Sequence, residues 1–317
     1  AENNLIYQGN QSSRFISFEW DVQIDINSFG FRDDEGIYEN GKKKILILGD
    51  SFTEGFGVSH ENTFSKKLEK RLIKENFNYS VLNAGITGNN LVDYVEIYNT
   101  YFKNFSDIKV VLIALFVGND LKDNNTLRKV TNLKKEKLFF RLKYFAAKNS
   151  TFYNILNRSV KSNFKIRKVL TKIGIIKEKE SILSNYDSKN KKFLKKINYS
   201  AHLINKFKDN NKKKRILVAL IPSKEQIDDN YWKFLKQIKN NNLPKLNRNL
   251  PTTLMQEKLN RYGVKFINFE TIFNNSIKLN HPIYFKYDAH TNENGHEIMA
   301  QEIFKMIKDN LSNNWLL

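Results

Sequence analysis

The chain contains no cysteine among its 317 residues. Disulfide bonds and metal sites built on thiolates are therefore excluded, and redox chemistry gives no information about the compartment. The sequence also lacks an uninterrupted apolar run of about 18 residues, the length that indicates a membrane-spanning helix. Neither an initiator Met nor a signal-peptide pattern stands at Ala1. A lost N-terminal signal or anchor would fit this start, which favours an extracytoplasmic or membrane-associated protein; a cytoplasmic location stays open.

Acidic residues are few relative to basic ones. The 33 Asp and Glu stand against 53 Lys and Arg, which gives a formal charge of +20. Such a charge attracts nucleic acid, anionic lipid or acidic glycan. However, Lys is abundant along nearly the whole chain, which favours a general compositional bias over a dedicated binding surface. No nucleic-acid-binding motif is present, so we expect no nucleic-acid partner.

Five short apolar runs, rich in β-branched residues, predict strands that are buried on both faces of a parallel sheet. They lie at residues 44–48, 80–83, 110–117, 215–221 and 264–269. Apolar residues at helical spacing follow the first two runs, at Phe64, Leu68, Leu72 and Ile73 and at Leu91, Tyr94, Val95 and Tyr98. Strands that alternate with helices predict an α/β fold, a three-layer α/β/α domain with a five-stranded parallel sheet of flavodoxin-like type.

Two segments fall outside this alternation. Residues 1–40 show no helical pattern and are predicted to form an N-terminal extension that packs on the main domain, residues 41–317. Residues 121–214 make the connection between the third and fourth strands unusually long, which predicts a helical insertion. Within it, residues 134–148 mix Lys and Arg with Leu and Phe. This part is either a cap that attracts an anionic glycan or membrane surface, or an inert structural appendage.

Polar residues follow the carboxyl ends of the predicted strands, where ligands bind in open parallel sheets. Ser51 follows the first strand, Gly85 the second and Asn119 the third. Asp288 and His290 come after the fifth. Because these strand ends share one rim of the sheet, we expect the five residues to converge on one site.

The chemistry of these residue types is that of nucleophilic catalysis. A serine hydroxyl attacks effectively only when a base removes its proton, and His290 is the candidate base for Ser51. Asp288, two positions earlier, could orient the imidazole ring and stabilise its charged form. The backbone N–H groups of Ser51 and Gly85 and the side-chain amide of Asn119 are candidate oxyanion donors, each worth about 3–4 kcal/mol. Asp50 is expected to hold the loop at Ser51 by hydrogen bonds and to take no part in the chemistry.

Gly49-Asp50-Ser51, directly after an apolar strand, resembles the first sequence block of the SGNH (GDSL-type) hydrolase superfamily. That superfamily is named for Ser, Gly, Asn and His residues in separate blocks. The matching residues are Ser51, Gly85, Asn119 and His290, and Asp288 matches the acid of the last block. Two blocks depart from the usual pattern: Val117 stands where Gly-x-Asn-Asp has its glycine, and Asp-x-His replaces Asp-x-x-His.

The resemblance implies a serine ester hydrolase that works through an acyl-enzyme and needs no cofactor. Similar bacterial proteins suggest a short acyl group, such as acetyl, on a glycan or another small ester. Two alternatives stay open: an O-acyltransferase with the same site, and a non-catalytic module that binds a polyanion. The sequence gives no oligomeric state.

Other readings of the same residues are weaker. A metal site made of Asp288, His290 and His296 lacks a further strong ligand nearby, so we expect no metal. His296 is predicted to be a packed helix residue. Residues 49–55 lack the Gly-Lys-Ser/Thr ending of a phosphate-binding loop. Residues 221–226 either line the substrate pocket or form only a turn marked by Pro222.

Overall fold

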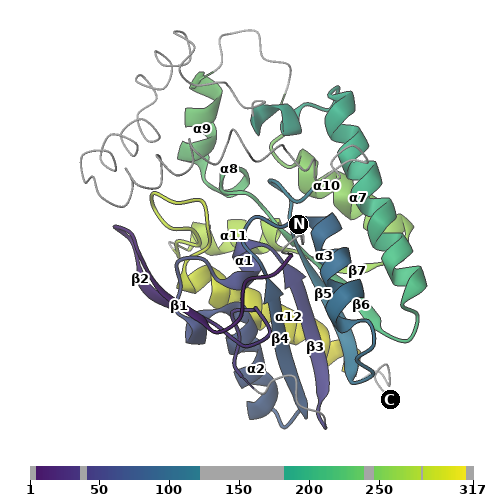
Figure 1. Cartoon of the computed structure of the whole chain (residues 1–317). Coiled ribbons are helices and arrows are strands. Elements are labelled where there is room, and N and C mark those ends of the chain that lie inside the picture. The colour runs from purple at the N-terminus through teal and green to yellow at the C-terminus, as the bar shows by residue number, and fades with distance from the viewer. Residues whose placement is uncertain (1–4, 36–40, 122–181, 239–245, 280, 312–317) are drawn as a thin grey trace, which may run out of the picture.

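The computed structural model describes residues 5–35, 41–121, 182–238, 246–279 and 281–311. Their centre is a parallel sheet of five strands in the order β4-β3-β5-β6-β7 (Figure 1). In chain order the strands are β3 (Lys43–Gly49), β4 (Tyr79–Gly85), β5 (Ile108–Phe116), β6 (Arg215–Ile221) and β7 (Lys265–Asn268).

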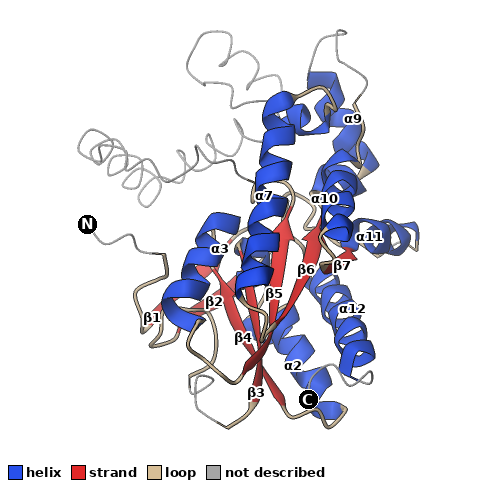
Figure 2. Cartoon of the chain, turned by 90° about the vertical axis from the view of Figure 1, so that its right-hand side faces the viewer, coloured by secondary structure: helices blue, strands red, loops and turns tan. Residues whose placement is uncertain are grey.

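Helices cover both faces of the sheet and complete three layers (Figure 2). One face carries α3 (Leu91–Ile97), α7 (Lys191–Asn210) and α10 (Leu250–Arg261). The other carries α2 (Phe64–Lys74), α11 (Phe269–Lys278) and α12 (Glu293–Leu311). Successive strand residues alternate between the two cores, because side chains of a strand point to opposite faces. Leu46 and Leu48 pack on the first face, and Ile45 and Ile47 on the second.

These observations confirm the predicted fold class. Each predicted apolar run coincides with a strand, although β5 begins at Ile108 rather than at residue 110. The helix after β3 is also present, but Ile73, which fits the apolar spacing in the sequence, is 61% exposed. Helical spacing alone therefore misplaced one residue of the buried stripe, whose buried positions are Phe64, Leu68 and Leu72.

The N-terminal residues form an antiparallel hairpin of β1 (Gln11–Ile16) and β2 (Asp21–Ile26). After the hairpin, the guanidinium of Arg32 is buried and donates hydrogen bonds to backbone carbonyls. Its acceptors are the carbonyls of Gln23 (3.2 Å), Glu54 (3.2 Å), Gly55 (2.7 Å) and Val58 (2.8 Å). The N-terminal segment is thereby attached to the chain that follows β3.

Of the predicted insertion, residues 122–181 lie outside the described part of the chain, and with them the basic segment 134–148. The described remainder holds a 3₁₀ turn, Ile182–Tyr186, and helix α7. Three short elements complete the part used below: α1 (Ser51–Glu54), α8 (Lys224–Ile227) and α9 (Asp229–Ile238). No helix among the described residues is long and apolar enough to cross a membrane.

His296 joins α12 to the start of α2, as the prediction of a packed helix residue requires. Its ring is 1% exposed, stacks on Phe64, and accepts the backbone N–H of Phe64 at Nδ1 (3.1 Å). Burial, with smaller contributions from nearby positive charges, lowers the pKa of His296 from 6.5 to about 3. The folded protein therefore holds this ring neutral where the unfolded chain would protonate it.

This shift predicts acid sensitivity with a defined sign. A histidine whose folded pKa is depressed contributes stability fully above its unfolded pKa, and that stability is lost as pH falls from about 6.5 toward 3. The slope is at most about 1.4 kcal/mol per pH unit. His296→Asn keeps an acceptor and removes the titration, so urea midpoints should fall less between pH 7 and pH 4.5 than in the parent. Equal pH dependence in both proteins would contradict this assignment.

Candidate active site

Ser51 begins helix α1 immediately after β3 ends. The Asp50 side chain caps this helix by accepting the backbone N–H of Phe52 (3.0 Å). Burial raises the pKa of Asp50 to about 7, and its Oδ2 has no hydrogen-bond partner among the described residues. Gly55 ends the helix at φ +87°, where a Cβ would meet Thr63 Cγ2 at 2.4 Å. A strand, a cap and a glycine thus fix the serine within one short turn.

His290 lies against this serine, although 239 positions separate the two residues in the sequence. His290 Nε2 lies 2.8 Å from Ser51 Oγ, and His290 Nδ1 lies 2.5 Å from Asp288 Oδ1. The same carboxylate oxygen accepts the backbone N–H of His290 (2.8 Å). The unusual Asp-x-His spacing therefore brings the carboxylate to the ring. With the Nδ1 proton directed at Asp288, Nε2 is placed to accept the serine proton.

The charge of Asp288 suits a role in orienting the imidazole of His290. Burial alone would raise the pKa of Asp288, but the hydrogen bonds and charge of His290, with the charge of Lys224, hold it below its ordinary value. Asp288 is therefore a carboxylate at neutral pH. The imidazole of His290 is also held by aromatic rings: Phe56 stacks on it at 4.3 Å between ring centroids, and Phe52 lies at 5.0 Å. These contacts orient the ring toward Ser51.

Two of the predicted oxyanion donors remain compatible with the structure. The N–H of Ser51 belongs to the first residue of α1, so it has no intrahelical acceptor. Asn119 is exposed in the turn after β5, the strand that pairs with β3. That turn is fixed by Asp120, whose buried Oδ2 accepts the Phe116 N–H and the Tyr94 hydroxyl, each at 2.7 Å. This role of Asp120 was not predicted from the sequence.

The prediction for Gly85 is not met. Its backbone N–H already donates to Asn83 Oδ1 (3.0 Å), and a Cβ at this position would lie 2.3 Å from the backbone nitrogen of Glu54. Gly85 therefore permits close packing of β4 against α1 and offers no free donor. Within the described residues, the N–H of Gly88 has no acceptor, and this glycine is exposed at φ +86°. The Thr87 N–H, donated to Glu54 Oε2 (2.6 Å), ties this loop to α1.

Glycines at both ends of Gly85-Ile-Thr-Gly88 were visible in the sequence. What the sequence did not show is which of the two N–H groups is already hydrogen-bonded. Among the residues that the structure describes, no three His, Asp or Glu side chains are grouped so that they could hold a metal ion. The site as described is a serine, an imidazole and a carboxylate, with backbone and amide donors nearby.

The fold and this arrangement of side chains fit a hydrolase that uses a serine. The family model described as "GDSL-like Lipase/Acylhydrolase family" matches residues 47–298. The chain belongs to this family, and it is a carboxylic ester hydrolase. The predicted resemblance is thereby confirmed.

Solved structures with a similar chain path are distant. An acetyl xylan esterase, AlAXEase, is 13% identical with a TM-score of 0.48, over 83% of this chain and 99% of that one. A lipase/acylhydrolase from Enterococcus faecalis is 12% identical with a TM-score of 0.46, over 84% and 96%. At these scores neither likeness carries an argument about substrate. The comparison with curated proteins found no match.

Replacement of the serine tests the nucleophile. In Ser51→Ala the hydroxyl predicted to attack the ester is gone, so kcat for ester hydrolysis should fall by about 10⁴-fold or more. The thermal midpoint should stay close to that of the parent, because only one oxygen is removed. A variant that keeps near-parental turnover would show that another residue attacks the ester.

Replacement of Asn119 tests the oxyanion donor. Because such a donor acts mainly in the transition state, Asn119→Ala should lower kcat by about 10²–10³-fold with little change in KM. Steady-state kinetics on one small ester separates the two constants. An effect on KM alone would make Asn119 a substrate-binding residue instead.

Proposed function

We propose that the protein hydrolyses O-acyl esters through a covalent acyl-enzyme on Ser51. His290 takes the hydroxyl proton as Ser51 Oγ attacks the carbonyl carbon, and then gives that proton to the departing alcohol. A water molecule, deprotonated by the same imidazole, next attacks the acyl-serine. The carboxylic acid leaves and the serine recovers its proton. Asp288 stabilises the imidazolium in both halves of the reaction.

One observation carries this proposal: the continuous contact from Asp288 Oδ1 through His290 to Ser51 Oγ, with distances of 2.5 Å and 2.8 Å. A module that only binds polyanions needs no such alignment. For the oxyanion, we propose the N–H groups of Ser51 and Gly88 and the amide of Asn119. The position of Gly88 in this set replaces the earlier expectation for Gly85, whose N–H is already bonded to Asn83.

For the substrate, we propose a short acyl group on a carbohydrate or a similar polyhydroxylated alcohol. The resemblance to bacterial SGNH proteins supports it, as does the polar character of the exposed loops beside the site. Thr87, Gly88 and Asn119 are exposed there and offer hydroxyl and amide groups. Such groups suit an alcohol rich in hydroxyls.

An ester panel tests this substrate class. Acyl chains from acetyl to decanoyl on one alcohol, and acetyl on simple alcohols against acetylated sugars, should give the highest kcat/KM for acetylated sugars. Ser51→Ala is the blank for each ester. A preference for long acyl chains would overturn the carbohydrate assignment and leave the ester hydrolase intact.

Product analysis with and without a glycan acceptor separates hydrolysis from acyl transfer, since transfer would yield an acylated acceptor.

The pH dependence should show a loss of activity on the acid side. The pKa of Asp288 lies below its ordinary value, so this carboxylate is charged at neutral pH. Activity should fall on acidification, because only a neutral imidazole can accept the serine proton. A kcat/KM profile from pH 4 to 9 checks this. A flat profile over that range would contradict a histidine base.

A further inference from the structure

The loop that carries Asp288 and His290 has little regular structure of its own. Residues 285–290 lie between the isolated bridge partners Tyr284 and Thr291, outside any helix or strand. A catalytic group needs to be held to within about 0.5 Å of its working position. One backbone hydrogen bond closes the loop internally, from the Phe285 N–H to the His290 carbonyl (3.0 Å), and further contacts come from elsewhere in the chain. Its backbone hydrogen-bonding groups show where those contacts come from.

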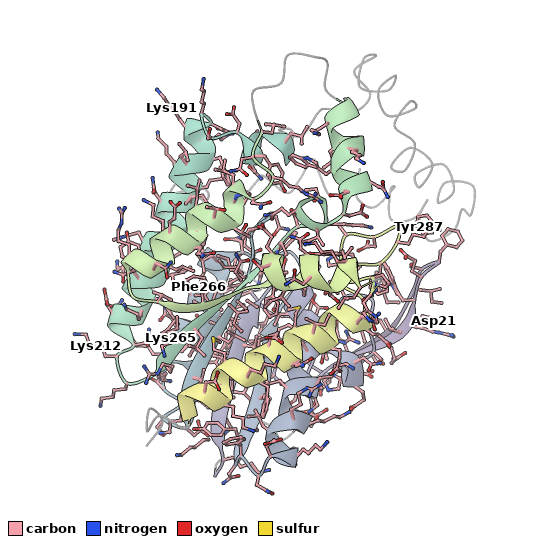
Figure 3. All side chains as sticks on the ribbon, turned by 180° about the vertical axis from the view of Figure 1, so that it is seen from behind. Asp21, Lys191, Lys212, Lys265, Phe266 and Tyr287 are labelled. Carbon is pink, nitrogen blue, oxygen red and sulfur yellow. The ribbon has the colours of Figure 1, made fainter. Side chains whose placement is uncertain are left out.

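Two N–H groups of this loop are bound by one carboxylate. Glu19, in the turn between β1 and β2, accepts the N–H of Lys286 at Oε1 (2.5 Å) and that of Tyr287 at Oε2 (2.9 Å). Both belong to the residues directly before Asp288. The Tyr287 side chain projects at the molecular edge, on the same side as Asp21 of the hairpin (Figure 3). A charged acceptor makes these bonds stronger than neutral ones.

Three carbonyl groups of the same loop are bound by one ammonium. Lys224, at the start of α8, donates from Nζ to the carbonyls of Phe285 (2.6 Å), Lys286 (2.8 Å) and Asp288 (3.1 Å). An ammonium has three N–H donors, which matches the number of these bonds. Lys224 is 6% exposed, so its charge is removed from water and compensated by these carbonyls. Its charge also helps to lower the pKa of Asp288.

The hairpin supports the loop through aromatic rings as well. Trp20, next to Glu19, lies 4.7 Å from the ring of Phe285 and 5.6 Å from that of Phe56. Phe56 in turn stacks on the imidazole of His290. The hairpin thus contacts the backbone on one side of the loop and, through Phe56, the ring that the loop carries.

We propose that Glu19 and Lys224 are positioning residues that hold the loop 285–290 by its backbone from two distant segments, and thereby keep Asp288 and His290 aligned with Ser51. This inference rests on the proposed acyl-enzyme function of that site. It gives a role to the N-terminal hairpin and to the turn after β6. Neither residue touches the ester; both act through the loop.

Glu19 and Lys224, together with the loop 285–290 that they hold, are called the clamp below. Kinetics of Glu19 variants test one half of it. With 4-nitrophenyl acetate as substrate, Glu19→Ala should lower kcat by about 10–100-fold, with KM within about twofold, because alignment and not binding is lost. Glu19→Gln keeps one acceptor oxygen and should recover part of the loss. Asp21→Ala is the matched control: it lies on the same hairpin, its one ion pair among the described residues is with exposed Arg14, and it should run at the parental rate. Equal kcat in Glu19→Ala and Asp21→Ala would overturn the inference.

The lysine half is tested in the same assay. Lys224→Met removes the ammonium at similar length, and Lys233→Met, on the exposed side of α9, is its control. Lys224→Met should lower kcat in the manner of Glu19→Ala. In the double variant that combines Glu19→Gln with Lys224→Met, the fold loss in kcat should be smaller than the product of the two single losses, since both residues hold one loop. Multiplicative losses would indicate two independent structural roles and contradict the clamp.

The outcomes separate the clamp from the function on which it rests. Parental activity in Ser51→Ala would refute the acyl-enzyme proposal whatever the clamp variants do. An inactive Ser51→Ala beside parental kcat in Glu19→Ala and Lys224→Met would refute only the clamp. Thermal midpoints are recorded for every variant. Because Glu19→Gln is a conservative change at a half-buried turn position, it tests the clamp even where Lys224→Met does not fold.

Discussion

The hydrogen bond between His290 Nε2 and Ser51 Oγ is the contact on which the site depends. It joins the turn after β3 to the loop before α12, and neither segment has the other as a neighbour in sequence. The parallel sheet makes this possible because the carboxyl ends of its strands share one rim. Serine reactivity then requires that the imidazole stay within hydrogen-bonding distance. Much of the structure around the site serves to keep it there.

That support is applied to the backbone of the catalytic segments. Arg32 binds carbonyls after α1, Asp120 fixes the turn that carries Asn119, and Glu54 holds the loop of Gly88. In our proposal Glu19 and Lys224 do the same for the loop of Asp288 and His290. These loops lie outside helices and sheets, so their backbone groups lack the hydrogen bonds of regular structure. Buried or half-buried charged groups supply those bonds instead. The N-terminal hairpin is therefore attached to the site as well as to the core.

Much of this was predictable from sequence, for physical reasons. Strands buried on both faces appear as continuous apolar runs, so β3 to β7 were located closely. The triad candidates Ser51, Asp288 and His290 follow strand ends, and the sheet topology brings them together. Gly85 failed as a predicted donor because the sequence cannot show whether an N–H is already bonded. Glu19 and Lys224 carry no motif, since they bind backbone groups that every residue type provides.

The rate and site of modification by an organophosphonate probe test the central claim most directly. The probe forms a covalent bond only with a nucleophile whose proton is removed during attack. The account predicts one adduct per chain, mapped to Ser51 by peptide mass spectrometry, and a rate that falls by orders of magnitude in His290→Ala. An adduct on another residue, or equal labelling of Ser51 in His290→Ala, would contradict a serine activated by this histidine.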